Sequence, residues 1–251
     1  MRCEPRGFLV AELQGRLVGQ VLSISYGELG WIGYLIVLQG YRRQGIGSAL
    51  MRTGIARLKV LDVQTIELEA RPEAVGLYEQ MGFEAEFKTW KYRCVNRPAS
   101  AVVTSKVEVM HDRDLVQAST LDKSHFFGDR SSVLEAILVD NPGRCYVADL
   151  KGTLRGYVMC RPTRTGFRIG PFVCDPNVPE VAEALLVAAM KSIPLGATIS
   201  ISAPETNRTC LDLLSKYGFE RLSPNVRMFV GKKLDPNRTL GVFALGGLEK
   251  G

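Results

Sequence analysis

The sequence contains two copies of one pattern, and this repeat limits the possible folds more than any other feature. LYEQMGFE at residues 77–84 and LLSKYGFE at residues 213–220 share a leucine, a spacing and a terminal GFE. Two upstream dipeptides also correspond, with two residues fewer between them in the second half: Ile32-Gly33 with Ile169-Gly170, and Ala49-Leu50 with Ala184-Leu185. Because the matches occur in the same order, we expect two copies of one fold.

The expected secondary structure repeats in the same way. β-branched and aromatic runs bounded by glycine turns predict strands, and apolar residues at helical spacing predict helices. The first half reads strand, strand, strand, helix, strand, helix, strand over 8–13, 16–26, 31–38, 48–61, 65–70, 74–81 and 87–94. Gly82 and Gly218 are expected to end the helix before each GFE.

The second half restarts after RPASAVVTS. It reads as a strand over 107–110, a helical region to about Ile137, strands over 145–150, 156–161 and 167–175, a helix over 178–192, a strand over 198–203, a helix over 211–217 and a strand over 226–231. The sequence therefore predicts a first domain at 1–96, a linker at 97–105 and a second domain at 106–251.

A basic, glycine-rich loop lies between a strand and a helix in the first copy. QGYRRQGIGSALM, residues 39–51, follows the apolar run WIGYLIVL. Free backbone N–H groups and the positive end of the helix dipole favour an anion there, such as a pyrophosphate. Gly45 and Gly47 allow close backbone approach, Arg42 and Arg43 can add charge-assisted hydrogen bonds, and Ser48 can add a hydroxyl. The loop has neither a Walker GK[ST] nor a GxGxxG dinucleotide pattern.

These segments together resemble motifs A and B of the GNAT superfamily of acyl-CoA-dependent N-acyltransferases. The likeness lies in WIGYLIVLQGYRRQGIGSALM and in ARPEAVGLYEQMGFE downstream. It implies a mixed α/β (α+β) fold in which each copy has a mostly antiparallel sheet flanked by helices. It also implies that the coenzyme A pyrophosphate of acetyl-CoA binds at the loop, in a set made up of Arg42, Arg43, Gln44, Gly45, Ile46, Gly47 and Ser48.

The resemblance assigns two further features of the donor site. The edge of the preceding strand, at Leu35, Ile36 and Val37, would pair with the pantetheine arm as an added strand does. The tyrosine of the family's LYEK-x-GF helix falls on Tyr78, which would protonate the departing thiolate. The sequence does not reveal a general base: Glu69 is one candidate, and a water relayed to a distant carboxylate is another.

The first copy also departs from the family pattern. A complete domain has a strand and two helices before the first strand expected here, and those helices normally wall the acceptor site. We therefore expect the first copy to lack them, which bears on turnover more than on coenzyme binding. Arg71 also stands where many members carry asparagine.

The second copy is expected to have lost the coenzyme site. Glu180 stands where Gly45 stands in the first copy, and a carboxylate there would repel a pyrophosphate. Leu214 replaces the tyrosine, although Asn207 occupies the family's asparagine position. FFGDRSSVLEAIL, GYVMCRPTRTGFRIGP and the closing FALGGLEKG resemble the C-terminal half of two-domain GNAT proteins. Asp129, Arg130 and Arg161, in these segments, are expected to be solvated or salt-bridged.

Composition excludes several other classes of function. The six cysteines are widely spaced and there are two histidines, His111 and His125, so no metal site is expected. No apolar run approaches the roughly 18–20 residues that span a membrane, and a cytoplasmic protein with reduced thiols is expected. The net charge is +6, but no run of basic residues suggests a nucleic-acid arm.

The sequence thus leads to one main hypothesis and two alternatives. The first is an acetyl-CoA-dependent N-acetyltransferase of a small amine, by direct transfer in a ternary complex, because no cysteine lies in the motif segments to carry an acyl group. The second is a non-catalytic acyl-CoA-binding or regulatory module. The third and weakest hypothesis is nucleic-acid binding through Arg42 and Arg43. For the oligomeric state, a homodimer is one option that the sequence leaves open.

Overall fold

The computed structural model describes residues 5–98 and 105–251, so residues 99–104 of the expected linker lie outside the described residues. The chain divides into two compact units. Unit 1 comprises the residues up to Glu86 together with Val226–Leu234 and Leu248–Gly251, and unit 2 comprises Phe87–Asn225 and Asp235–Gly247. The domains expected from the sequence, 1–96 and 106–251, describe the two copies of the repeat, and their boundaries stay a prediction.

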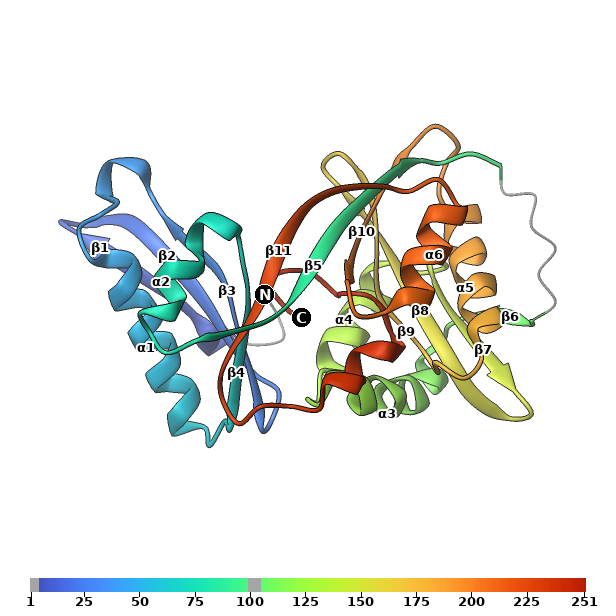
Figure 1. The fold of residues 1–251 in the computed structure, drawn as a ribbon, viewed down its shortest axis with the longest axis horizontal. Coiled ribbons are helices and arrows are strands. Elements are labelled where there is room, and N and C mark those ends of the chain that lie inside the picture. The colour runs from blue at the N-terminus through green and yellow to red at the C-terminus, as the bar shows by residue number, and fades with distance from the viewer. Residues whose placement is uncertain (1–4, 99–104) are drawn as a thin grey trace. The chain divides into compact units, whose positions relative to one another are not determined.

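The described residues of unit 1 form a mixed sheet with two helices, α1 and α2 (Figure 1). Its strand order is β1-β2-β3-β4-β11, in which β3 and β4 are parallel and the other neighbours antiparallel. The elements of the first copy other than its last strand are β1 (Phe8–Leu13), β2 (Arg16–Ser25), β3 (Leu29–Val37), α1 (Ile46–Val60), β4 (Thr65–Ala70) and α2 (Val75–Glu79), with 3₁₀ turns at Pro5–Gly7, Gln39–Tyr41 and Pro72–Ala74.

Unit 2 is a larger mixed sheet with four helices among its described residues. Its strand order is β5-β10-β9-β8-β7-β6, and β12 pairs with β9. The remaining elements of the chain are β5 (Glu84–Val95), β6 (Val107–Val109), α3 (Leu115–Phe126), α4 (Ser131–Asp140), β7 (Cys145–Leu150), β8 (Thr153–Thr163), β9 (Gly166–Cys174), α5 (Pro179–Lys191), β10 (Thr198–Pro204), α6 (Arg208–Lys216), β11 (Glu220–Gly231) and β12 (Val242–Ala244), with 3₁₀ turns at Asp112–Asp114 and Pro236–Gly241.

The sheets confirm the repeat down to their irregularities. The β1–β2 ladder shifts register between Ala11 and Glu12, and the β7–β8 ladder shifts between Ala148 and Asp149. β3 carries one extra residue between Gly33 and Ile36, and β9 carries one between Ile169 and Phe172. Such β-bulges bend a strand and re-aim its side chains. Two copies of one mixed α/β fold are therefore present.

The final strands of the two copies are exchanged between the units. β5, from the first copy, pairs antiparallel with β10 over Thr89–Val95. β11, from the second copy, pairs antiparallel with β4, where Val226 lies opposite Ala70 and Gly231 opposite Thr65. Neither copy therefore completes its own sheet, and the compact units do not coincide with the sequence repeats.

Each unit has its own apolar core. In unit 1, α1 and α2 cover one face of the sheet, and the core includes Ile32, Met51, Leu68, Tyr78 and Met228. In unit 2 the core is formed mainly by α5, α6 and strands β8 to β10. The close packing of α1 on β3 explains Gly30, because a Cβ there would lie 2.9 Å from the side chain of Val63 and 3.0 Å from that of Leu58.

A buried arginine lies on the opposite face of the unit 1 sheet. Arg227 of β11 donates from Nη1 to Glu67 Oε2 over 2.9 Å and from Nε to Glu69 Oε1 over 2.8 Å. Its guanidinium carbon lies 4.6 Å from the ring centroid of Trp31 on β3. Burial lowers the pKa of Arg227, but Glu69 and Glu67 raise it by more, so the side chain stays charged. This cluster joins strands from both copies.

Some elements differ from the sequence-based expectations. The helical region before Ile137 is two helices, because Phe127 ends α3 with a φ of 64°. β5 and β11 begin earlier than expected, since their polar first residues hide the strand pattern. β12 was not expected. Within the described part of the chain, no helix is long and apolar enough to cross a membrane.

We predict that Arg227→Met lowers the free energy of unfolding by about 3–5 kcal/mol, because it leaves Glu67 and Glu69 buried without their cation. Chemical denaturation followed by circular dichroism measures this loss. Arg52→Met on the exposed face of α1 is the matched control and is expected to change stability by less than about 0.5 kcal/mol. An Arg227 variant as stable as the control would contradict the structural role of the cluster.

Candidate functional site

The basic loop of the first copy forms a tight turn between β3 and α1. Arg43 and Gly45 have left-handed backbones, with φ of 60° and 79°. Arg42 donates from Nε to the carbonyl of Val37 over 3.0 Å, and Gln44 donates to the carbonyl of Gly40 over 3.2 Å. Alternating left-handed residues turn successive N–H groups toward one side, as in anion-binding nests.

The amino terminus of α1 has no side-chain cap. Gly45 is the N-cap residue, and its carbonyl accepts the first helical bond, from Ala49 N over 2.9 Å. The N–H groups of Ile46, Gly47 and Ser48 precede that bond, and the first turn contains no acidic residue. A Cβ added to Gly47 would have its nearest neighbour 3.7 Å away, so the backbone is open there. This helix end favours an anionic ligand.

β3 separates from β4 just before the loop. The two strands pair in parallel only from Leu29 opposite Thr65 to Ile32 opposite Leu68, among the described ladders. From Gly33 onward β3 pairs with β2 alone, and the bulge places Tyr34 at a φ of 52°. The edge at Leu35–Val37 is therefore open on the β4 side, over roughly 10 Å at 3.3 Å per residue.

Tyr78 lies in α2 in the same core as the base of the loop. Its ring packs edge-on against Phe83, with centroids 6.1 Å apart, while Leu35, Val37 and Ile46 pack against this cluster. The hydroxyl makes no hydrogen bond within the described residues, and it is not fully buried. Burial of the ring raises the pKa of the phenol, so Tyr78 stays protonated at neutral pH.

Glu69 and Arg71, the other residues singled out near Tyr78, have different surroundings. Glu69 is bound to Arg227 in the buried cluster, so its carboxylate contributes to the fold. Arg71 is exposed, and its guanidinium lies 4.0 Å from Glu73. The roles predicted for Tyr78, for Glu69 and for the loop residues stay predictions.

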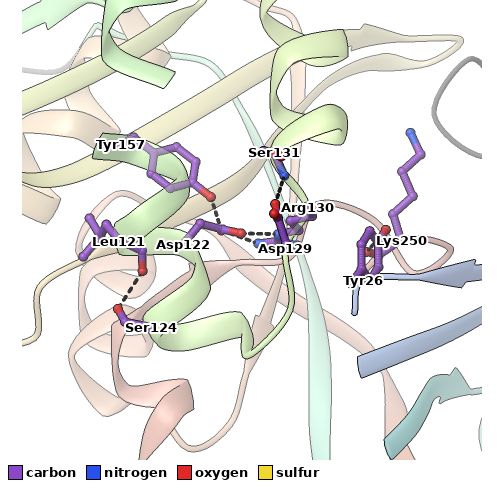
Figure 2. Close-up of polar contacts among 9 residues, drawn as sticks. All are labelled: Tyr26, Leu121, Asp122, Ser124, Asp129, Arg130, Ser131, Tyr157 and Lys250. Atoms are coloured by element: carbon purple, nitrogen blue, oxygen red, sulfur yellow. Dashed lines mark hydrogen bonds and ion pairs between the residues drawn. The ribbon is translucent and has the colours of Figure 1, made fainter. Parts of the chain in front are cut away.

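A segment that the sequence did not single out as a site lies across β3. Trp31 donates from Nε1 to the carbonyl of Leu248 over 3.2 Å. Tyr26 donates from its hydroxyl to the carbonyl of Lys250 over 3.0 Å (Figure 2). A Cβ on Gly33 would lie 2.6 Å from the Cα of Glu249. We call Leu248–Lys250 the tail. The sequence marked this position by a glycine that occurs in both copies, as Gly33 and Gly170. It did not reveal that the backbone of Glu249 packs against Gly33.

The equivalent opening of the second copy is filled by the chain itself. In the ladders that the structure describes, β9 and β10 pair at Phe167 with Ile199 and at Arg168 with Ser200 and not beyond. Beyond that point β12 pairs with β9, and Leu245 N donates to the carbonyl of Ser202 on β10 over 2.8 Å. The backbone carbonyl of Leu245 lies against Gly170, the counterpart of Gly33. Glu180 lies in the first turn of α5.

The polar residues of the second copy are engaged in structural contacts. Arg130 donates to both oxygens of Asp122 over 2.7 and 2.9 Å, and the Tyr157 hydroxyl donates to the same carboxylate (Figure 2). Asp129 accepts from Ser131 N at the start of α4. Arg161 donates to the carbonyls of Gly170 and Gly246, and so fixes the segment after β12.

The cysteines and histidines show no reactive arrangement among the described residues. Five cysteines are buried and free, and burial raises the pKa of the Cys160 thiol to about 12. His125 contacts the Arg238 carbonyl at 3.0 Å, and His111 caps the turn at Asp112–Asp114. No group of three or more His, Cys, Asp or Glu in the described ranges could hold a metal ion.

Comparisons with known proteins match both halves of the chain. The family model described as "Acetyltransferase (GNAT) domain" matches residues 118–244, about half of the chain. The family model described as "Acetyltransferase (GNAT) family" matches residues 2–83. The two matches fall on the second and the first copy of the repeat.

Several known proteins are similar to this chain over almost its whole length. An uncharacterized N-acetyltransferase, YitH of Bacillus subtilis, is 26% identical over 91% of this chain and 79% of its own length. A holothin acyltransferase of a Pseudoalteromonas species is 22% identical over 92% of this chain and 76% of its own length. The crystal structure of a putative acetyltransferase from Pyrococcus horikoshii superposes with a TM-score of 0.83 and 27% identity, covering 100% of this chain and 82% of that one.

We predict that Gly33→Ala detaches the tail from β3, because the added Cβ would overlap the backbone of Glu249. Hydrogen exchange of the Leu248–Lys250 amides should become faster, and stability should fall by about 1–3 kcal/mol. Gly76→Ala is the control, since nothing lies within 4 Å of a Cβ there and alanine favours the helix. Unchanged amide exchange in the Gly33 variant would show that the tail does not depend on this contact.

Proposed function

The chain belongs to the GNAT acetyltransferase family, and from this premise we propose that it transfers the acetyl group of acetyl-CoA to the amine of a small molecule. The observation that carries the proposal is the uncapped amino terminus of α1 beside Arg42 and Arg43, at the end of a strand with an open edge. The open strand edge is followed by the basic loop and the helix amino terminus. In the same way, the pantetheine arm of coenzyme A is followed by its pyrophosphate.

The coenzyme A part of the donor would bind from the loop toward the bulge. Its pyrophosphate would accept hydrogen bonds from the N–H groups of Ile46, Gly47 and Ser48 and gain charge from Arg43. Its pantetheine amides would pair with the open edge at Leu35–Val37, as an added strand. Gln44 and Gly45 would shape the turn, and Ile36, which is exposed, would border the arm.

The acyl transfer requires no covalent enzyme intermediate. The neutral amine nitrogen attacks the thioester carbonyl carbon, the C–N bond forms, and the C–S bond breaks. The amine loses one proton, and the departing thiolate gains one. The five described cysteines are buried, and burial raises the pKa of each thiol, which supports direct transfer in a ternary complex.

Tyr78 is the proposed proton donor to the thiolate. Its ring is fixed by the core, its hydroxyl has no partner in the described residues, and burial keeps the phenol protonated by raising its pKa. A rigid ring with an available hydroxyl is suited to an acid, because its position costs little entropy in the transition state.

We propose one donor site per chain. In the second copy, β12 and Leu245 occupy the opening between β9 and β10 that corresponds to the open edge of β3. Glu180 adds a negative charge where a pyrophosphate would bind. The second copy would then have a structural role, and the first copy would bind acetyl-CoA.

The small-molecule acceptor is supported by one relative that is named for acyl transfer to holothin.

The competing hypothesis, a non-catalytic acyl-CoA-binding module, makes a different prediction. It requires saturable binding of acetyl-CoA without thiol release for any amine.

We predict that isothermal titration finds one acetyl-CoA bound per chain and that Gly47→Glu weakens the affinity at least about tenfold. The new carboxylate would lie in the first turn of α1, where it favours the helix but repels the pyrophosphate. Thr53→Glu, exposed on the same helix, introduces the same charge and is expected to leave the affinity within about twofold. Two bound molecules per chain, or equal affinities for both variants, would refute the proposed site.

We predict that Tyr78→Phe lowers kcat by about 10²–10⁴-fold and leaves the affinity for acetyl-CoA nearly unchanged, because the ring and its packing remain. Thiol release across a panel of amines measures kcat, and titration measures the affinity. A large loss of acetyl-CoA affinity would contradict the role of Tyr78 as an acid. Binding without thiol release for any amine would favour the non-catalytic module.

A further inference from the structure

The tail, Leu248–Lys250, lies on the face of β3 opposite α1. A Cβ added to Gly54 of α1 would lie 3.8 Å from the side chain of Ile32, so Ile32 points toward the helix. Side chains alternate along a strand, so Trp31 and a Cβ built on Gly33 lie on the other face, where both positions contact the tail. The tail therefore covers the face that α1 and α2 leave uncovered.

The contact with Glu249 falls at the acyl end of the proposed donor site. The pyrophosphate would bind after the end of β3, and the pantetheine arm would run back along Val37, Ile36 and Leu35. Three strand residues span roughly 10 Å, so the thioester would lie beside Gly33 and Tyr34. At Gly33 the opposing backbone is that of Glu249. The tail is thus next to the place where the acceptor nitrogen must attack.

Glu249 is the carboxylate-bearing residue of the tail whose backbone lies at this place. Its side chain is 17% exposed, and its described polar contact is a loose one, with Lys250 Nζ at 3.8 Å from Oε1. The buried cluster on the same face contains two further carboxylates, Glu67 and Glu69, which are paired with the guanidinium of Arg227. A carboxylate attracts a cationic group of a substrate and repels an anionic one.

We propose that Glu249 is a specificity-determining residue that binds a second, charged nitrogen of the acceptor, so that the substrates are diamines or polyamines. This inference rests on the proposed function. The reacting nitrogen must be neutral when it attacks the thioester, so its charge attraction to a carboxylate ends when it loses its proton. A second ammonium keeps its charge throughout the reaction and can be held by Glu249 in the transition state.

The first test compares two amines that differ by one ammonium group, 1,4-diaminobutane and n-butylamine, at saturating acetyl-CoA. The wild-type kcat/KM should be higher for the diamine. Glu249→Gln should lower kcat/KM for the diamine about tenfold and leave that for butylamine unchanged, because one charge-assisted bond is lost. Glu249→Asp should retain part of the preference. Glu12→Gln, exposed on β1, is the matched control and should change neither value.

The second test does not need turnover. Calorimetric binding of 1,4-diaminobutane to the protein saturated with coenzyme A should be weaker in Glu249→Gln than in the wild type and the Glu12 variant. Equal binding by Glu249→Gln, or no binding by the wild type, would overturn the role of Glu249. Binding of the diamine without thiol release from acetyl-CoA would instead refute the proposed acetyl transfer and leave the assignment of Glu249 intact.

Discussion

The Arg227 cluster is the interaction on which the rest of unit 1 depends. A guanidinium buried beside Trp31 is stable only because Glu67 and Glu69 accept its hydrogen bonds. The two carboxylates lie on β4 of the first copy, and the arginine lies on β11 of the second. The last strand of the second copy is therefore tied by charge to the sheet of the first. An apolar residue at position 227 would leave two carboxylates buried in the same place.

The exchange of β5 and β11 has consequences for both copies. Because β11 pairs with β4, the sheet of the first copy is complete on that side, while β3 and β4 still part beyond Ile32 and Leu68. In the second copy the same parting occurs between β9 and β10, but β12 fills it. One fold has thus kept its opening in one copy and closed it in the other. The closing segment continues into the tail that contacts Gly33.

The candidate site combines elements that differ in how strongly the chain constrains them. The loop and the α1 amino terminus supply backbone groups whose orientation follows from two left-handed residues, Arg43 and Gly45. Tyr78 is placed by core packing, which also raises the pKa of its phenol by removing water. The proposed acceptor side, in contrast, is bordered by a short tail whose contacts with unit 1 include two hydrogen bonds and one close backbone approach.

Much of the fold could be predicted from the sequence, because local patterns carry it. The repeated GFE, the alternation of strands and helices and the family membership were all evident from residue order, and so was the loop at 39–51. What the sequence could not show was pairing between distant segments. β5 and β11 read as ordinary last strands, and nothing local indicates that each completes the sheet of the other copy. Gly33 was visible as a repeated residue, but only the tertiary structure shows that the backbone of Glu249 lies against it. Backbone contacts between residues far apart in the chain leave no periodic trace in a sequence, and it is these contacts that decide which face of β3 is covered and which residue lies against Gly33.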